Sequence, residues 1–337
     1  MPETTATITT FAEFPKRTML ENLAVRADGS VLVVASPQRQ LWYVPAPSDR
    51  LPVEPVLLHT FDEGQLAQSL VEAEPDLYYV FTYGNAMMHR LDLRGWAPGD
   101  PVAPTKVLDF EPPAGPNGSD LLAPGVMLLA DCVEGLIWRI DLSEDGLSAT
   151  AEVWLKHDTM AAGGGHPPVK FSDTQEVPFP GINGLRYGPE TRHVYYATSS
   201  QNLFMRVAVD PTTLGPAGEP EHLGDVENVD DLCLDEVVGV AYIARHPDHK
   251  IERVPLEPGP SGPGPSGPGR AVVAAGDPFT DHLIGPTSIH WGRAPGDYGR
   301  VAYVPTDGGV IKLPPDGELR PARLVRVEFP AEDAAQG

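Results

Sequence analysis

The sequence predicts an all-β fold, a six-bladed β-propeller of four-stranded antiparallel blades around a central channel. A phrase made of a short apolar run, a turn and a denser apolar run recurs six times along the 337 residues. Two copies of the phrase separate Glu21 from Asn117, 96 residues apart, and one copy separates Asn183 from Asp230, 47 residues apart. That period suits a propeller blade, which takes roughly 40–50 residues. Helical periodicity is nearly absent, so helical repeats are not favoured.

Each copy of the phrase supplies two strands rich in β-branched and aromatic residues. The denser runs are VLVVA from Val31, LYYVF from Leu77, VMLLA from Val126, HVYYA from His193, VGVAYIA from Val238 and RVAYV from Arg300. A short polar loop and a second strand follow each run. One blade cannot bury its own apolar face, so the blades must stack into a single domain covering 1–337. We expect blades to begin near residues 21, 68, 117, 183, 230 and 287.

Two segments interrupt the repeat. Residues 156–180 form an insertion between the third and fourth blades, long enough to carry function. Residues 257–270, rich in Pro, Gly and Ser, are predicted to be a flexible surface loop between the fifth and sixth blades.

Composition limits the classes of partner. The formal net charge is −23, from 47 acidic and 24 basic residues, which argues against nucleic acid or an anionic membrane, since both require basic patches. The two cysteines, Cys132 and Cys233, are expected to be buried free thiols. The N-terminal residues lack a signal-peptide pattern and no apolar run reaches 18 residues. A cytoplasmic protein acting on a small molecule is the simplest reading, and the sequence does not address its oligomeric state.

The antiparallel meander predicts where a site would lie. The first residue of each inner strand, the loop between the second and third strands, and the connection between blades all meet at one face. The first residues of the inner strands are Glu21, Gln68, Asn117, Asn183, Asp230 and Thr287. The loops, the insertion and the last blade add candidate substrate-binding residues, namely Tyr83, Met87, His89, Phe179, Gln201, Arg245, His246 and Trp291.

Four of the six first residues carry an acceptor oxygen. Glu21, Asn117, Asn183 and Asp230 at equivalent positions would form a hard-oxygen ring that suits Ca²⁺ or Mg²⁺ and could accept Mn²⁺ or Zn²⁺. Two carboxylates forced together would repel each other unless a cation lies between them. A structural role is the alternative, because Asp and Asn also begin strands and cap turns through local hydrogen bonds.

Three of the repeats resemble segments of the SMP-30/gluconolactonase/regucalcin-like propellers. LENLAVR, INGLRYGPETRHVYYATSSQNLFMRVAVD and VDDLCLDEVVGVAYIA occur in the order of that family's first, fourth and fifth blades. The resemblance implies that Glu21, Asn183 and Asp230 hold one divalent cation. It also implies that Asn117 contacts substrate or metal-bound water.

The same resemblance implies hydrolysis of a lactone or ester, with Asp230 as general base and Asn117 orienting the substrate. The sugar-lactonase pattern also has an Arg shortly before the blade-three Asn and an Asp directly after it. Here those places are Gly115 and Gly118. A sugar-acid lactone is therefore not the expected substrate.

Two other functions remain open. The wording of LENLAVR and of VEAEPDLYYV in the second blade is similar to propellers of microbial secondary metabolism, including hetero-Diels–Alderases. Such a cyclase would need an apolar channel and no obligatory metal chemistry. The third possibility is a propeller that binds a ligand or a protein without catalysis, since this fold hosts many functions.

Overall fold

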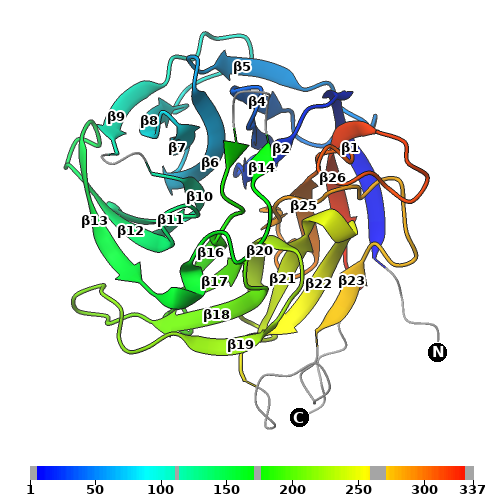
Figure 1. Ribbon diagram of the computed structural model, residues 1–337. Coiled ribbons are helices and arrows are strands. Elements are labelled where there is room, and N and C mark those ends of the chain that lie inside the picture. The colour runs from blue at the N-terminus through cyan, green and yellow to red at the C-terminus, as the bar shows by residue number, and fades with distance from the viewer. Residues whose placement is uncertain (1–5, 111–113, 171–175, 259–270, 331–337) are drawn as a thin grey trace.

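The computed structural model describes residues 6–110, 114–170, 176–258 and 271–330. Within them the chain forms six four-stranded antiparallel sheets arranged around a common axis (Figure 1), so the predicted fold is confirmed. Blade 1 contains β2 (Leu20–Val25), β3 (Val31–Ala35), β4 (Gln40–Val44) and β5 (Val56–Thr60). Blade 2 contains β6 (Gln65–Glu74), β7 (Leu77–Gly84), β8 (Met87–Asp92) and β9 (Thr105–Asp109). Blade 3 contains β10 (Pro116–Ala123), β11 (Val126–Asp131), β12 (Leu136–Leu142) and β13 (Ala149–Lys156).

The second half of the ring repeats this order. Blade 4 contains β16 (Ile182–Gly188), β17 (His193–Thr198), β18 (Leu203–Ala208) and β19 (Glu221–Asp225). Blade 5 contains β20 (Val229–Asp235), β21 (Val240–Arg245), β22 (Lys250–Pro255) and β23 (Val272–Ala275). Blade 6 contains β24 (His290–Trp291), β25 (Val301–Pro305), β26 (Pro321–Glu328) and, as its outermost strand, β1 (Thr7–Lys16).

The strand β1 closes the ring, and the repeat did not predict it. It pairs antiparallel with β26, from Thr7 opposite Glu328 to Lys16 opposite Pro321. The first and last strands of the described chain therefore lie side by side in one blade (Figure 1). This pairing covers an edge that would otherwise present free backbone groups.

The core lies between the blades. In the described part of the chain, six clusters of buried apolar side chains each join two neighbouring blades. Every residue of β3 is buried, as are the first six residues of β7. A second strand that packs against a blade on each side buries both of its faces, so its sequence is a continuous apolar run instead of an alternation.

The two interruptions have different places in the fold. The insertion begins after β13 and contains the 3-10 turn η1 (Asp158–Met160) and a short hairpin of β14 (Val169–Lys170) and β15 (Glu176–Val177). The Pro/Gly-rich segment joins β22 to β23, so it lies inside blade 5 and not between two blades. Its residues 259–270 are outside the described residues, so its predicted flexibility stays a prediction.

Helices contribute almost nothing to the described residues. Besides η1, η2 (His246–Asp248) is a 3-10 turn of three residues. None of the helices found there is long and apolar enough to cross a membrane.

Candidate functional site at the channel mouth

The inner strands begin with a bulge, and the bulge positions the site. In β2 the pairing with β3 skips from Leu20 to Leu23, which leaves Glu21 and Asn22 out of register. A similar skip leaves unpaired residues in four of the other five inner strands, all except β24, namely Gln68 in β6, Asn117 and Gly118 in β10, Asn183 and Gly184 in β16, and Asp230 and Asp231 in β20. A bulge frees residues from the ladder and redirects their side chains. The repeated polar residue therefore faces the channel.

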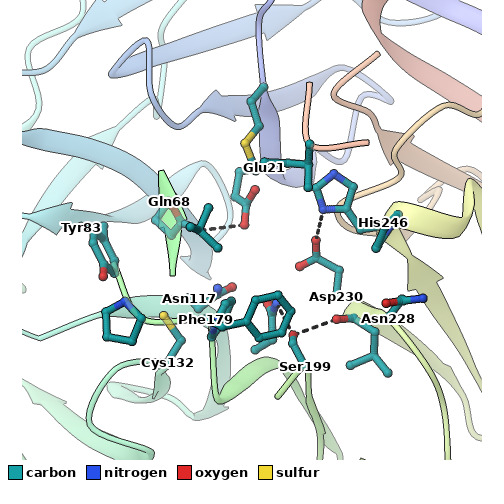
Figure 2. A pocket seen from close by; sticks show the side chains of 18 residues that line it. Glu21, Gln68, Tyr83, Asn117, Cys132, Phe179, Ser199, Asn228, Asp230 and His246 are labelled. Atoms are coloured by element: carbon teal, nitrogen blue, oxygen red, sulfur yellow. Dashed lines mark hydrogen bonds and ion pairs between the residues drawn. The ribbon is translucent and has the colours of Figure 1, made fainter. Parts of the chain in front are cut away.

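Five of these residues form the floor of a cavity at the mouth of the channel, namely Glu21, Gln68, Asn117, Asn183 and Asp230. The space measures about 820 Å³ with its opening to solvent included. In Figure 2 the carboxylates of Glu21 and Asp230 point into the same space, while Phe179 lies across it. The cavity is lined by Met19, Glu21, Gln68, Tyr83, Asn117, Cys132, Val169, Pro178, Phe179, Pro180, Asn183, Ser199, Asn228, Val229, Asp230, His246, Pro247 and Ile311.

Two acceptor oxygens on the floor have no partner in the described residues. Glu21 accepts a hydrogen bond from Gln68 on Oε1 over 2.6 Å, but its buried Oε2 accepts none. Asn183 donates from its amide nitrogen to Ser199 Oγ over 2.9 Å, and its buried Oδ1 is also unsatisfied. An unsatisfied buried acceptor is costly, so two of them at one site indicate a missing donor or cation.

A buried histidine holds the other carboxylate of the floor. His246 Nδ1 lies 3.1 Å from Asp230 Oδ2, and His246 Nε2 lies 3.0 Å from Asp307 Oδ2. Despite burial, Asp307 and Asp230 raise the pKa of His246 well above its ordinary value. The two carboxylates on either side of the imidazole therefore favour its protonated form.

Burial also changes the acidity of the two floor carboxylates. Burial, and then the charge of Asp230, raise the pKa of Glu21 well above its ordinary value. Burial raises the pKa of Asp230, against the lowering effect of the hydrogen bond from His246. A cation between the two side chains would favour the ionised form of both.

A second polar layer lies directly below the floor. Asp231 Oδ2 accepts from Asn22 over 3.0 Å, from Arg186 over 2.6 Å and from Ser288 over 2.7 Å. These side chains come from blades 1, 4, 5 and 6. Arg186 also lies 2.5 Å from His290 Nε2, and burial followed by the Arg186 charge lowers the pKa of His290 well below its usual range.

The structure brings together eight of the predicted site residues. They are Glu21, Gln68, Tyr83, Asn117, Phe179, Asn183, Asp230 and His246. The remaining six do not line the cavity, and each has other contacts. They are Met87, His89, Gln201, Arg245, Thr287 and Trp291.

The contacts of these six explain their placement. Met87 accepts on sulfur from Gln65, and His89 packs on Phe61 with a centroid distance of 5.1 Å. Gln201 donates to the backbone of Asp158 in the insertion. The remaining three satisfy their own polar groups away from the cavity, with Arg245 bound to Glu252, Thr287 to the Leu20 carbonyl and Trp291 to the Leu234 carbonyl.

Several lining residues were not predicted, although the sequence carried a signal for some. Met19 lies directly before β2 and two positions from Glu21. Cys132 and Ser199 come directly after the second strands of their blades, in loops that the meander places at the mouth. Tyr83 lies near the end of β7, the second strand of blade 2, whereas Met87 begins the next strand, β8, so Tyr83 lines the cavity and Met87 does not.

The donor set fits a divalent cation only if an amide is counted. The described residues contain no group of three His, Cys, Asp or Glu side chains placed to hold a metal ion. Glu21, Asn183 and Asp230 instead combine two carboxylates with an amide oxygen, which is a donor set for Ca²⁺ or Mg²⁺. The unsatisfied Glu21 Oε2 and Asn183 Oδ1 make this set fit a cation.

Comparison with known proteins gives the fold. No protein-family model matches the chain, and no curated protein matches it in sequence. A solved luciferin-regenerating enzyme is similar with a TM-score of 0.62 and 16% identity, over 96% of this chain and 95% of that chain. The chain shares its fold with the SMP-30/gluconolactonase-like propellers.

Two further solved structures support this. The calcium-binding protein regucalcin from Agrobacterium tumefaciens has a TM-score of 0.60 and 14% identity, over 96% of this chain and 97% of that one. A gluconolactonase from Xanthomonas campestris has a TM-score of 0.60 and 12% identity, over 96% of this chain and 90% of that one. At these identities the likeness concerns the fold alone.

Proposed function

We propose that this protein is a divalent-cation-dependent hydrolase of the lactonase or esterase type, acting on a small organic substrate in the channel mouth. The observation that carries the proposal is the pair of buried, unsatisfied oxygens Glu21 Oε2 and Asn183 Oδ1 on the cavity floor. The similarity in fold to a calcium-binding regucalcin and to a gluconolactonase supports the reaction class.

In this proposal Glu21, Asn183 and Asp230 hold the cation, with Ca²⁺ the best match to a set of hard oxygens. A bound divalent cation would polarise the substrate carbonyl and make water a better nucleophile. Asn117 lies on the same floor, where its amide can hold the carbonyl oxygen in place.

Asp230 is the candidate general base. Its carboxylate lines the cavity floor, where it can accept a proton from a water molecule beside the bound substrate. His246 holds it in a fixed orientation from one ring nitrogen, and Asp307 fixes His246 from the other. The proton of the attacking water would pass to Asp230 and then to the alcohol oxygen released when the acyl C–O bond breaks.

The test combines metal analysis with activity. Purified protein should contain about one divalent cation per chain, lose hydrolysis of a lactone panel in chelator, and regain it with Ca²⁺ or another divalent ion. Asp230→Asn should abolish turnover, whereas Asp49→Asn, at an exposed position, should leave it unchanged. Full activity in chelator with no bound metal would contradict the proposal.

One observation favours a second candidate, a cyclase of secondary metabolism. Apolar side chains, including Phe179, Val169 and Ile311, surround the upper cavity, and such a surface can fold a reactive apolar chain. This reaction would not need the cation. Cyclisation of a polyene or quinone methide that persists in chelator would favour the cyclase.

A further inference from the structure

The upper part of the cavity is built from apolar side chains. Above the polar floor lie Met19, Val169, Pro178, Phe179, Pro180 and Ile311, which we call the apolar wall. They come from the start of blade 1, from the insertion after β13 and from the last blade. Apolar side chains from three segments that are far apart in the sequence thus surround the entrance of the cavity.

The wall is held in place, and part of its surface is open to solvent. The ring of Phe179 stacks on His166 with a centroid distance of 4.4 Å, and its carbonyl accepts from Gly163 over 2.8 Å. Ile311 is 43% exposed, while its amide is fixed by a 2.8 Å hydrogen bond to Asp307 Oδ2. Exposed apolar area on a fixed frame is what an apolar ligand group would bury.

Among the described lining residues, no basic side chain is left free for an anion, because His246 already lies between Asp230 and Asp307. Among the described lining residues there is no Lys or Arg, whereas the floor carries Glu21 and Asp230. Arg245, one residue before His246, points to Glu252 and Asp248 instead. A ligand that enters along the wall is therefore expected to be uncharged.

In blade 3, Gly115 and Gly118 occupy the positions where the sugar-lactonase pattern has an Arg and an Asp. A Cβ at Gly118 would lie 2.5 Å from the Leu185 nitrogen, and a Cβ at Gly115 would lie 2.6 Å from Val133 Cγ2. Neither position has room for an Asp or an Arg on this backbone. Blade 3 therefore offers no Asp or Arg side chain at these two positions to bind the hydroxyl groups of a sugar.

We propose that the apolar wall is a subsite for an alkyl or aryl arm of a neutral lactone or ester, whose carbonyl lies at the floor. The proposal rests on the hydrolase function above and adds the substrate class to it. Water adds its oxygen to the carbonyl carbon, the acyl C–O bond breaks, and the alcohol oxygen takes up a proton. The other product is a carboxylate with an apolar arm, for which the cavity offers no Lys or Arg counter-charge.

The kinetic arm of the test varies chain length with the cation-loaded protein. From γ-butyrolactone to γ-decalactone, kcat/KM should rise about fourfold per methylene until the wall is filled, as expected for burying one CH₂. Phe179→Ala should lower kcat/KM for γ-decalactone at least tenfold and leave that for γ-butyrolactone within twofold. The matched control is Phe279→Ala, because Phe279 is 43% exposed and does not line the cavity.

The binding arm separates this proposal from the hydrolase function. Calorimetry with 2-pentylcyclopentanone, a neutral ketone that cannot be hydrolysed, should show binding to the wild type and to Phe279→Ala. Binding should be at least tenfold weaker for Phe179→Ala. Binding without any lactone hydrolysis would keep the subsite and overturn the hydrolase. No binding, equal binding by Phe179→Ala, or a preference for glucono-δ-lactone would overturn the subsite.

Discussion

His246 Nδ1 lies 3.1 Å from Asp230 Oδ2, in a buried site where Asp307 occupies the other ring nitrogen. The cavity floor therefore contains a fixed histidine, whose protonated form the two carboxylates favour, beside one of the carboxylates proposed to bind metal. This contact ties the stability of the metal-free protein to pH.

The metal-free protein should lose stability as the pH rises. The folded-state pKa of His246 is raised, so its contribution is fully present below its ordinary value of about 6.5 and is lost as the pH passes the raised pKa. The raised pKa of Glu21 acts in the same direction, because the unfolded chain ionises first. In chelator, the Tm should fall as the pH rises above about 6.5.

His246→Gln should flatten that dependence. His282→Gln is the control, because His282 is exposed and its contact is with Thr10, far from the floor. Thermal unfolding in chelator at several pH values would measure the slope for each protein. An unchanged slope in His246→Gln would show that this histidine does not carry the effect.

Glu21→Gln should remove the stabilisation by Ca²⁺. A ligand at one hundred times its Kd stabilises the native state by about 2.7 kcal/mol, which a Tm measurement resolves. The variant loses one anionic ligand, so the Ca²⁺-induced rise in Tm should largely disappear. Glu144→Gln, at an exposed position, should keep it, and an equal Tm rise in Glu21→Gln would mean that Ca²⁺ binds elsewhere.

Asp231→Asn should destabilise the fold strongly. It leaves the Arg186 charge buried without its carboxylate at 2.6 Å, and breaking a buried pair typically costs about 3–5 kcal/mol. Chemical denaturation would measure the loss. Asp109→Asn breaks a solvent-exposed contact with Lys106 and should leave the denaturation midpoint nearly unchanged. Similar midpoints for the two variants would count against the second polar layer as a structural centre.

Gly118→Ala should disturb the floor through the backbone. The added Cβ would lie 2.7 Å from the Asn183 carbonyl and 2.5 Å from the Leu185 nitrogen, so β16 must move. We expect Ca²⁺ affinity to fall at least tenfold, measured by calorimetry. Gly224→Ala is the matched control and should keep the wild-type affinity, since its added Cβ would meet only Val254, at 4.0 Å. Wild-type affinity in Gly118→Ala would show that β16 shifts without moving Asn183.

His89→Phe should make the fold more resistant to acid. Burial lowers the pKa of His89 to about 4, so the unfolded chain takes up the proton first as the pH falls below about 6.5. The resulting loss reaches on the order of 3 kcal/mol near pH 4. Stability against denaturant at pH 7 and pH 4, compared between variant and wild type, measures it. An equal loss in both proteins would exclude His89 as the cause.

The repeat predicted the blades and the polar ring because both depend on local pattern. Strands such as 31–35 are continuous apolar runs because both of their faces pack against neighbouring blades. Glu21, Asn183 and Asp230 occupy the same place in each phrase. The closing strand β1 could not be found this way, since TITTFAEFPK lacks the repeated phrase and pairs with residues more than 300 positions away.

The sequence alone also could not predict which side chains point into the cavity. Tyr83 and Met87 lie in one short stretch, yet only Tyr83 reaches the cavity because Met87 already belongs to the next strand. Asp307 is the opposite case. The meander places its loop, between the second and third strands of blade 6, at the channel mouth, but its contact with His246 depends on two blades meeting. Such pairings follow from packing between blades, which no single repeat specifies.

The β1–β26 pairing has a consequence for how the chain assembles. Glu21 follows β1 and is made early during synthesis, whereas Asp230 belongs to blade 5, and blade 6 lies between their two blades in the ring. The two carboxylates become neighbours only after β26 has been made and has found β1. A cation shared by them would therefore bind the closed ring and not the growing chain, so its capture would mark the completion of folding.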